Sequence, residues 1–278
     1  MLKKISLDQI AVGNYTYPLY SFEFFLESCL RMEIDTIELW AAGPHLYLED
    51  FDYFMLGEMR RQIQNRRLKA VCLTPEQCAY PVNLGAREEF VRRRSISYFK
   101  KAIRAAEVME IPAVLVTPGN GYRNEESHDT WKYTVENIKY LSDYALDCGV
   151  VLYLEHLTEQ TTNIAIRAAD IRRLIDEVHR KNLVYMVDTD MMSRYGETIR
   201  DYIEETGRAP AHVHLVDGMP GGHLALGDGN VPLYDCLEEL DEISYKGYMT
   251  LEITNDRYFF EPEKAIRKSL EWLRQYIR

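Results

Sequence analysis

The sequence predicts a (β/α)8 (TIM) barrel that occupies the whole chain, residues 1–278, as a single domain. Three observations support this fold class. Apolar stretches alternate with amphipathic stretches eight times, the length is close to the roughly 250 residues typical of such barrels, and no linker or low-complexity segment divides the chain. A doubly wound open sheet is the main competitor, but no Gly-x-Gly-x-x-Gly sequence follows the first expected strand.

The first half of the chain reads as four strand–helix units. Apolar, β-branched stretches predict strands over residues 5–12, 36–40, 69–74 and 113–117. Apolar residues that recur every three or four positions predict helices over residues 22–30, 51–66, 86–109 and 127–148. Ser21 immediately precedes the first helix, where its hydroxyl can accept a hydrogen bond from a backbone N–H as an N-cap.

The second half continues the same alternation. Buried-type strands are expected within the stretches 150–156, 183–188, 211–217 and 248–252. Amphipathic spacing predicts helices over residues 168–180, 197–206, 232–243 and 262–276. Eight strands that alternate with eight helices form the arrangement expected of the (β/α)8 barrel.

Each of the last four strands has a side chain that can bind a metal at or near its C-terminal end. These residues are Glu155, Asp188, His214 and Glu252. A single carboxylate that ends a strand often only caps the next helix, but four such residues at one topological position favour a shared metal site at the active-site mouth of the barrel. Three carboxylates and one imidazole suit a divalent ion such as Mn²⁺, Co²⁺ or Mg²⁺.

Composition excludes several classes of protein. The net charge of −11 disfavours binding to nucleic acid or to anionic membranes, and no apolar run approaches the roughly 20 residues of a membrane span. Asp8 interrupts the N-terminal apolar stretch, so a signal peptide is not expected. The five cysteines contain no Cys-x-x-Cys pair, which is typical of reduced thiols in a cytoplasmic protein.

Further motifs carry a resemblance to a known family over nearly the whole chain. They are Ile37-Glu38-Leu39-Trp40 with Pro44-His45, Thr74-Pro75-Glu76 with Tyr80-Pro81 and Asn83, Leu154-Glu155 with Leu157-Thr158 and Asn163, Val187-Asp188, His212-Val213-His214-Leu215-Val216-Asp217, and Gly227-Asp228-Gly229 with Pro232-Leu233. With these motifs in this order, the chain resembles the family of xylose-isomerase-like sugar-phosphate isomerases and epimerases. Within that family it resembles the ketose 3-epimerases, including those that act on fructoselysine.

The resemblance implies a mechanism. The four residues named above would bind one divalent ion, with Mn²⁺ the first expectation, and the substrate would be a ketose or a ketose conjugate. Glu155 and Glu252 would act on opposite faces of the substrate carbon: one removes the C3 proton and the other returns it, through a cis-enediolate. The residues support the same logic, because inverting a stereocentre by proton transfer needs two acid/base groups.

Six further residues are candidates for binding the sugar. They are Glu38, Trp40, Tyr80, Asn83, His156 and His223. For His156, which follows Glu155, the simplest expectation is a side chain that faces the opposite side of the strand. The chain also departs from the family, with Met191, Thr161 and Pro220 at positions where ketose 3-epimerases have a His, a Glu and an Arg.

Three other functions compete with the epimerase. A lyase on the same scaffold would resemble the large subunits of C-glycoside deglycosidases, which act on 3-oxo-glycosides with a small partner subunit, or inosose dehydratase. An apurinic endonuclease needs a trinuclear zinc cluster and a basic surface, which seven histidines and an acidic chain do not favour. A non-catalytic sugar-binding barrel would keep four metal ligands unused.

The family resemblance also implies a homo-oligomer, either a dimer or a tetramer.

Overall fold

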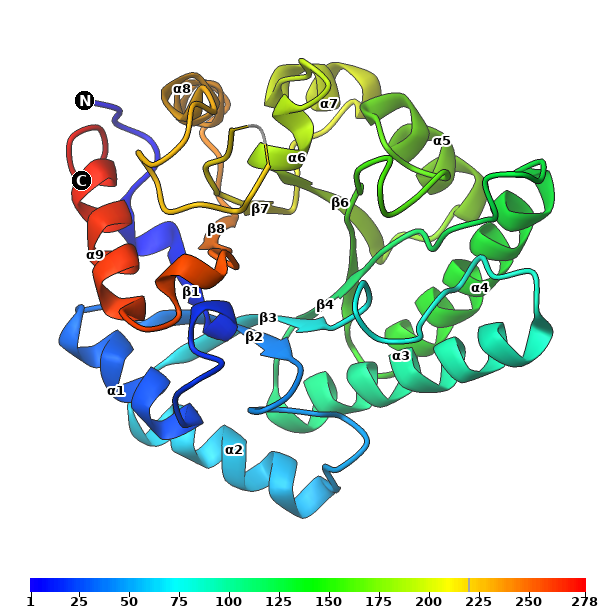
Figure 1. Ribbon diagram of the computed structural model, residues 1–278, viewed down its shortest axis with the longest axis horizontal. Coiled ribbons are helices and arrows are strands. Elements are labelled where there is room, and N and C mark those ends of the chain that lie inside the picture. The colour runs from blue at the N-terminus through cyan, green and yellow to red at the C-terminus, as the bar shows by residue number, and fades with distance from the viewer. Residues whose placement is uncertain (220) are drawn as a thin grey trace.

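The computed structural model describes residues 1–219 and 221–278, and these form a closed parallel barrel. Each strand pairs with its sequence neighbours, and the first strand pairs in parallel with the last, so the sheet has no free edge. Figure 1 shows the strands around the centre with the helices outside them. The predicted (β/α)8 barrel is therefore confirmed.

The eight strands are short and largely buried. Their bounds are β1 Ile10–Gly13, β2 Thr36–Ala41, β3 Lys69–Pro75, β4 Ala113–Val116, β5 Val151–Leu154, β6 Leu183–Asp188, β7 His212–His214 and β8 Tyr248–Leu251. Strands buried on both faces are expected in a barrel whose outer surface is covered by helices. This explains why apolar residues run continuously along β1 and β4 instead of alternating with polar ones.

The helices form the outer layer. Their bounds are α1 Phe22–Arg31, α2 Tyr53–Asn65, α3 Glu89–Met109, α4 His128–Asp147, α5 Ala168–Val178, α6 Thr189–Ser193, α7 Ile199–Thr206, α8 Leu233–Glu242 and α9 Pro262–Leu273. Ser21 caps α1 as expected, because its side chain accepts a hydrogen bond from the backbone N–H of Phe24. The two ends of the chain meet, since Leu2 N–H donates to the Tyr276 carbonyl.

The structure differs from the prediction in the first strand, in the seventh strand and in one additional helix. The first strand begins at Ile10 rather than at residue 5, because residues Leu7–Gln9 form a 3-10 turn (η1). The seventh strand contains only His212–His214, so Asp217 belongs to the loop that follows it. The short helix α6, which the hydrophobic spacing did not predict, starts directly after Asp188. A helix of five residues is too short to show helical periodicity in the sequence.

Candidate metal centre

The four predicted ligands meet at one mouth of the barrel. Asp188 and His214 are the last residues of β6 and β7, and Glu155 and Glu252 directly follow β5 and β8. One ligand atom from each of the four side chains lies within 4.8 Å of the others. Neighbouring parallel strands bring their C-terminal ends together, which is why residues far apart in the sequence converge here.

The facing atoms of these side chains fit a bound cation. The Nδ1 atom of His214 is 3.0 Å from Glu155 Oε1 and 3.1 Å from Glu252 Oε2. All three atoms, together with Asp188 Oδ2, are buried and lack a hydrogen bond of acceptable geometry among the described residues. Buried polar atoms are normally hydrogen-bonded, so four that approach one another without such bonds indicate ligands for a divalent ion.

Burial and mutual repulsion shape the charges of the carboxylates. Burial raises the pKa of Glu155 to about 7 and that of Asp188 to about 6. Burial also opposes ionisation of Glu252, but the positive charges of His214 and His223 lower its pKa to about 2. Three carboxylates in so small a volume need a compensating positive charge, which a divalent cation supplies when bound.

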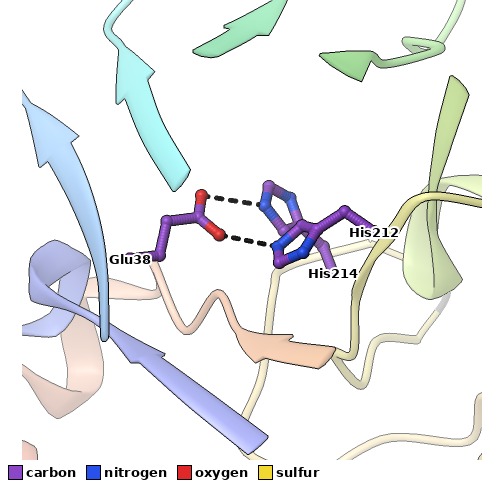
Figure 2. Close-up of side chains that lie close together, drawn as sticks. All are labelled: Glu38, His212 and His214. Atoms are coloured by element: carbon purple, nitrogen blue, oxygen red, sulfur yellow. Dashed lines mark hydrogen bonds and ion pairs between the residues drawn. The ribbon is translucent and has the colours of Figure 1, made fainter. Parts of the chain in front are cut away.

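Glu38 lies beneath this mouth and does not face the solvent. It sits in the middle of β2, with no exposed surface, and not at the end of the strand where the sequence suggested a sugar contact. Figure 2 shows its carboxylate facing the imidazoles of His212 and His214, at 2.9 Å and 3.1 Å from their Nε2 atoms. A direct substrate contact by Glu38 is therefore not supported by its position.

Trp40 and Tyr15 form an aromatic wall beside the four ligands. Their rings stack with centroids 5.6 Å apart, and the Tyr15 ring lies edge-on to His214 with centroids 6.4 Å apart. Trp40 Nε1 donates a hydrogen bond to Glu76 Oε2, which fixes the indole at the end of β2. A sugar contact by Trp40 stays a prediction.

His223 stands at the rim of the centre. Its Nδ1 atom is 3.2 Å from Glu252 Oε2, and its Nε2 atom is 3.9 Å from Asp188 Oδ2. The two carboxylates raise the pKa of His223 to about 10 against the opposing effect of burial. Pro220, the position at which the family resemblance implied an arginine, lies outside the described residues. His223 is therefore the cationic side chain that this loop brings to the four ligands.

The remaining sugar-binding candidates, Asn83 and Tyr80, have other partners in the structure. The Asn83 amide is engaged by backbone groups, since its Oδ1 accepts from Gly85 and Asn120 and its Nδ2 donates to the Asn120 carbonyl. Tyr80 packs edge-on against Tyr47 beside a cavity of about 660 Å³ between the loops after β2 and β3. These contacts give Asn83 a structural role and place Tyr80 in an outer cavity.

His156 points away from the centre, as the alternation of side chains along a strand predicts. It is fully buried against Tyr202, with ring centroids 5.1 Å apart. Its Nε2 accepts a hydrogen bond from the backbone N–H of Asp188, at 3.3 Å. Burial lowers the pKa of His156 to about 3, which keeps the ring neutral. A sugar contact by His156 is therefore not supported by its position.

Two buried polar residues that were not among the predicted site residues support the site. Thr74 on β3 donates a hydrogen bond to Glu38 at 2.6 Å. Asp190 in α6 has no exposed surface and accepts the backbone N–H groups of Gly221 and His223, which holds the loop that carries His223. No spacing in the sequence singles out either residue, because each contacts a segment distant along the chain.

Comparison with known proteins agrees with this geometry. The chain is 28% identical over 267 residues to fructoselysine 3-epimerase of Shigella flexneri, covering 95% of each chain. Its fold matches the crystal structure of 3-keto-D-glucoside 4-epimerase from E. coli (TM-score 0.81, 19% identity, 96% and 99% of the two chains). It also matches the IOLI protein with a bound zinc atom (TM-score 0.79, 21% identity, 95% of each chain).

The family model described as the xylose isomerase-like TIM barrel matches residues 26–276, which include all four candidate ligands. The match therefore extends over nearly all of the barrel and over the mouth where these side chains converge. The chain belongs to the xylose isomerase-like TIM barrel family.

Proposed function

We propose that this chain is a divalent-cation-dependent epimerase that inverts C3 of a ketose or of a ketose conjugate of the fructoselysine kind. The observation that carries the proposal is the convergence of four buried, unpaired ligand atoms from Glu155, Asp188, His214 and Glu252. The likeness to fructoselysine 3-epimerase extends over 95% of each chain, and it supports a sugar isomerase or epimerase.

The two glutamates provide the acid and base that the reaction needs. Glu155 and Glu252 come from β5 and β8, which are separated around the barrel by β6 and β7, and both carboxylates approach His214 Nδ1. One carboxylate removes the proton from the substrate carbon, and the other returns a proton to the opposite face. A bound divalent cation supplies positive charge to the substrate oxygens as negative charge develops on them. We propose Mn²⁺, with Co²⁺ or Mg²⁺ as alternatives.

The surroundings of the glutamates suggest how a sugar is held. Trp40 and Tyr15 offer a stacking surface beside the centre, and His223 places a charged imidazole where it can donate to a sugar hydroxyl. Met191 replaces the histidine of related ketose 3-epimerases and is buried, with its backbone N–H donating to Asp188. We therefore propose that His223 takes over part of the sugar recognition.

The decisive experiment is hydrogen exchange in D₂O with the Mn²⁺-reconstituted protein. The substrates are free ketoses, fructoselysine-type conjugates and 3-oxo-glycosides, and the products are identified by NMR. We expect deuterium at C3 together with a second epimer. Deuterium at C4 would make the chain a 4-epimerase, and release of an aglycone would indicate the lyase, which the comparisons do not favour.

Two variants test the roles of the glutamates. Glu155→Gln and Glu252→Gln each remove a proton-transferring group while keeping the size of the side chain, so deuterium incorporation should fall below detection. Glu159→Gln, on the exposed loop after β5, is the matched control and should exchange at the wild-type rate. Retained exchange in both of the first two variants would overturn the two-base mechanism.

A further inference from the structure

Glu38 is a buried carboxylate that the proposed proton transfer does not use. It lies on β2, its carboxylate meets side chains of β7 across the interior of the barrel, and it has no exposed surface. The register between β2 and β3 shifts between Ile37 and Glu38, an irregularity of the kind that redirects a side chain. Burying a carboxylate costs several kcal/mol unless other groups compensate for the lost water. Its hydrogen-bond partners therefore explain why it is tolerated.

Four side chains donate to this one carboxylate. Oε1 accepts from the Tyr15 hydroxyl at 2.7 Å, from the Thr74 hydroxyl at 2.6 Å and from His214 Nε2 at 3.1 Å. Oε2 accepts from His212 Nε2 at 2.9 Å. Two hydroxyls and two imidazole N–H groups converging on the two oxygens form the environment that stabilises a carboxylate anion. An ionised carboxylate can only accept hydrogen bonds, so every facing group must donate.

Together with a cation at the mouth, this requirement decides the tautomer of His214. A neutral imidazole carries one N–H, and carboxylates lie equally close to both of its nitrogens. Glu155 and Glu252 can also bind the cation, whereas Glu38 faces only side-chain donors, so the N–H belongs on Nε2. The lone pair is then left on Nδ1, the atom that faces Glu155 and Glu252. A metal ligand must offer a lone pair, and the opposite tautomer would direct an N–H at the cation.

His212, on the same strand as His214, contacts the other oxygen of the Glu38 carboxylate. Its ring stacks on Tyr153, with centroids 5.5 Å apart and an interplanar angle of 14°, and it lies edge-on to His214. Its Nε2 is 2.9 Å from both Glu38 Oε2 and Thr250 Oγ1. The stacked ring holds the direction of this hydrogen bond, so His212 fixes the orientation of the carboxylate that in turn orients His214.

We propose that Glu38, held by His212, is a positioning residue that keeps His214 in the Nε2–H tautomer with its Nδ1 lone pair directed at the cation. The same carboxylate oxygen binds Tyr15, so Glu38 also aligns the aromatic wall with the metal ligands. The proposal rests on the metal centre of the proposed function, but it does not depend on which sugar is the substrate.

The test measures binding of Mn²⁺ alone, by isothermal titration, to wild-type protein and to two variants. Glu38→Gln keeps the size of the side chain but removes the anion, and we expect it to weaken Mn²⁺ binding about 10- to 100-fold. Thr134→Val removes a buried hydroxyl on α4 that donates to the Pro118 carbonyl and has no contact with Glu38, and it should bind Mn²⁺ within about threefold of wild type. Unchanged affinity in Glu38→Gln would overturn the proposal.

A measurement on the wild-type protein keeps the proposal testable if Glu38→Gln fails to fold. Long-range ¹H–¹⁵N NMR of the Zn²⁺-loaded, ¹⁵N-histidine-labelled protein reports which nitrogen of each ring is protonated. We expect His214 to be protonated at Nε2 and metal-bound at Nδ1, and the reverse would overturn the proposal. Wild-type protein that binds Mn²⁺ without exchanging deuterium would contradict only the epimerase function, so the two failures are distinguishable.

Discussion

At the scale of single residues, the alternation of side chains along β5 separates two adjacent residues into different roles. Glu155 faces the metal centre, whereas His156 packs against Tyr202 on the other side of the strand. The first position is therefore the proposed catalytic one, and the second contributes to the packing of the core. The contrast also bears on the competing lyase function, in which His156 would be an additional catalytic group.

His156→Ala should keep deuterium exchange while destabilising the fold. Removing a fully buried ring leaves a cavity, so we expect the free energy of unfolding to fall by about 2 to 4 kcal/mol. Urea denaturation gives the stability, and NMR in D₂O gives the exchange rate of the folded protein. Exchange lost in a folded His156→Ala protein would indicate a catalytic role and would favour the lyase.

His45 predicts a pH dependence of stability at a distance from the metal centre. Its Nδ1 is 2.9 Å from the Asn14 amide nitrogen, and its Nε2 donates to the Tyr20 carbonyl at 2.8 Å. Burial lowers the pKa of His45 below its ordinary value near 6.5. Below that value the unfolded chain binds more protons than the folded one, so the stability contributed by His45 is present above about pH 6.5 and declines as the pH falls.

The measurement is the difference in unfolding free energy between wild type and His45→Gln. Glutamine does not titrate. The unfolding free energy of wild type should therefore fall relative to that of His45→Gln as the pH is lowered from about 7.5 to about 5. Comparing the two proteins cancels the contributions of the other titrating groups. A difference that stays constant over this range would contradict the assignment.

At the scale of elements, the backbone of the loop after β7 folds around the carboxylate of Asp217. Asp217 Oδ1 accepts the backbone N–H groups of Gly218 and Val231, and its Oδ2 accepts those of Gly227 and Gly229. A Cβ at position 229 would collide with the Gly218 carbonyl oxygen, so glycine allows this close approach. The loop that carries His223 is therefore organised by hydrogen bonds from its own backbone.

Asp217→Asn should loosen this loop without unfolding the barrel. The amide nitrogen cannot accept hydrogen bonds, so two of the four are lost, at a cost of about 2 to 4 kcal/mol. Native-state hydrogen exchange should accelerate at the amides of Gly227 and Gly229, while amides within β6 keep their protection. Unchanged exchange at both glycines would show that Asp217 does not organise the loop.

At the scale of the whole molecule, the metal centre couples the strands of the second half of the barrel. Its four candidate ligands come from the ends of β5 to β8, so a cation bound there would stabilise the folded chain by mass action.

The described helices include none that is long and apolar enough to cross a membrane. The homo-oligomer expected from family relatives stays a prediction, which sedimentation can test.

Mn²⁺ should raise the unfolding free energy by about 2.7 kcal/mol at about 100 times its Kd, and a chelator should reverse this gain. Asp188→Asn removes one ligand and should abolish most of the gain. Without metal, the same variant should be at least as stable as wild type, because burial beside other carboxylates disfavours the charge of Asp188. A metal-free variant much less stable than wild type would contradict this account of the centre.

The sequence by itself determined the barrel and the four candidate ligands. Hydrophobic spacing located all eight strands, and the polar residues that end the last four fall at one mouth in any parallel barrel. The sequence-based prediction is wrong where an element is too short for the hydrophobic pattern to identify it. The turn at Leu7–Gln9 and the five-residue helix α6 are too short to show a period.

Only the tertiary structure decided which of the other polar residues belong to the site. Glu38 meets His212 and His214 across the interior of the barrel, and Asp190 meets the loop of His223, although each pair is far apart in the sequence. Asn83 and His156 looked equally functional but hold a loop and fill the core. Hydrophobic period reports which face of an element is buried, whereas the partner of a buried polar group depends on how the strands close in space.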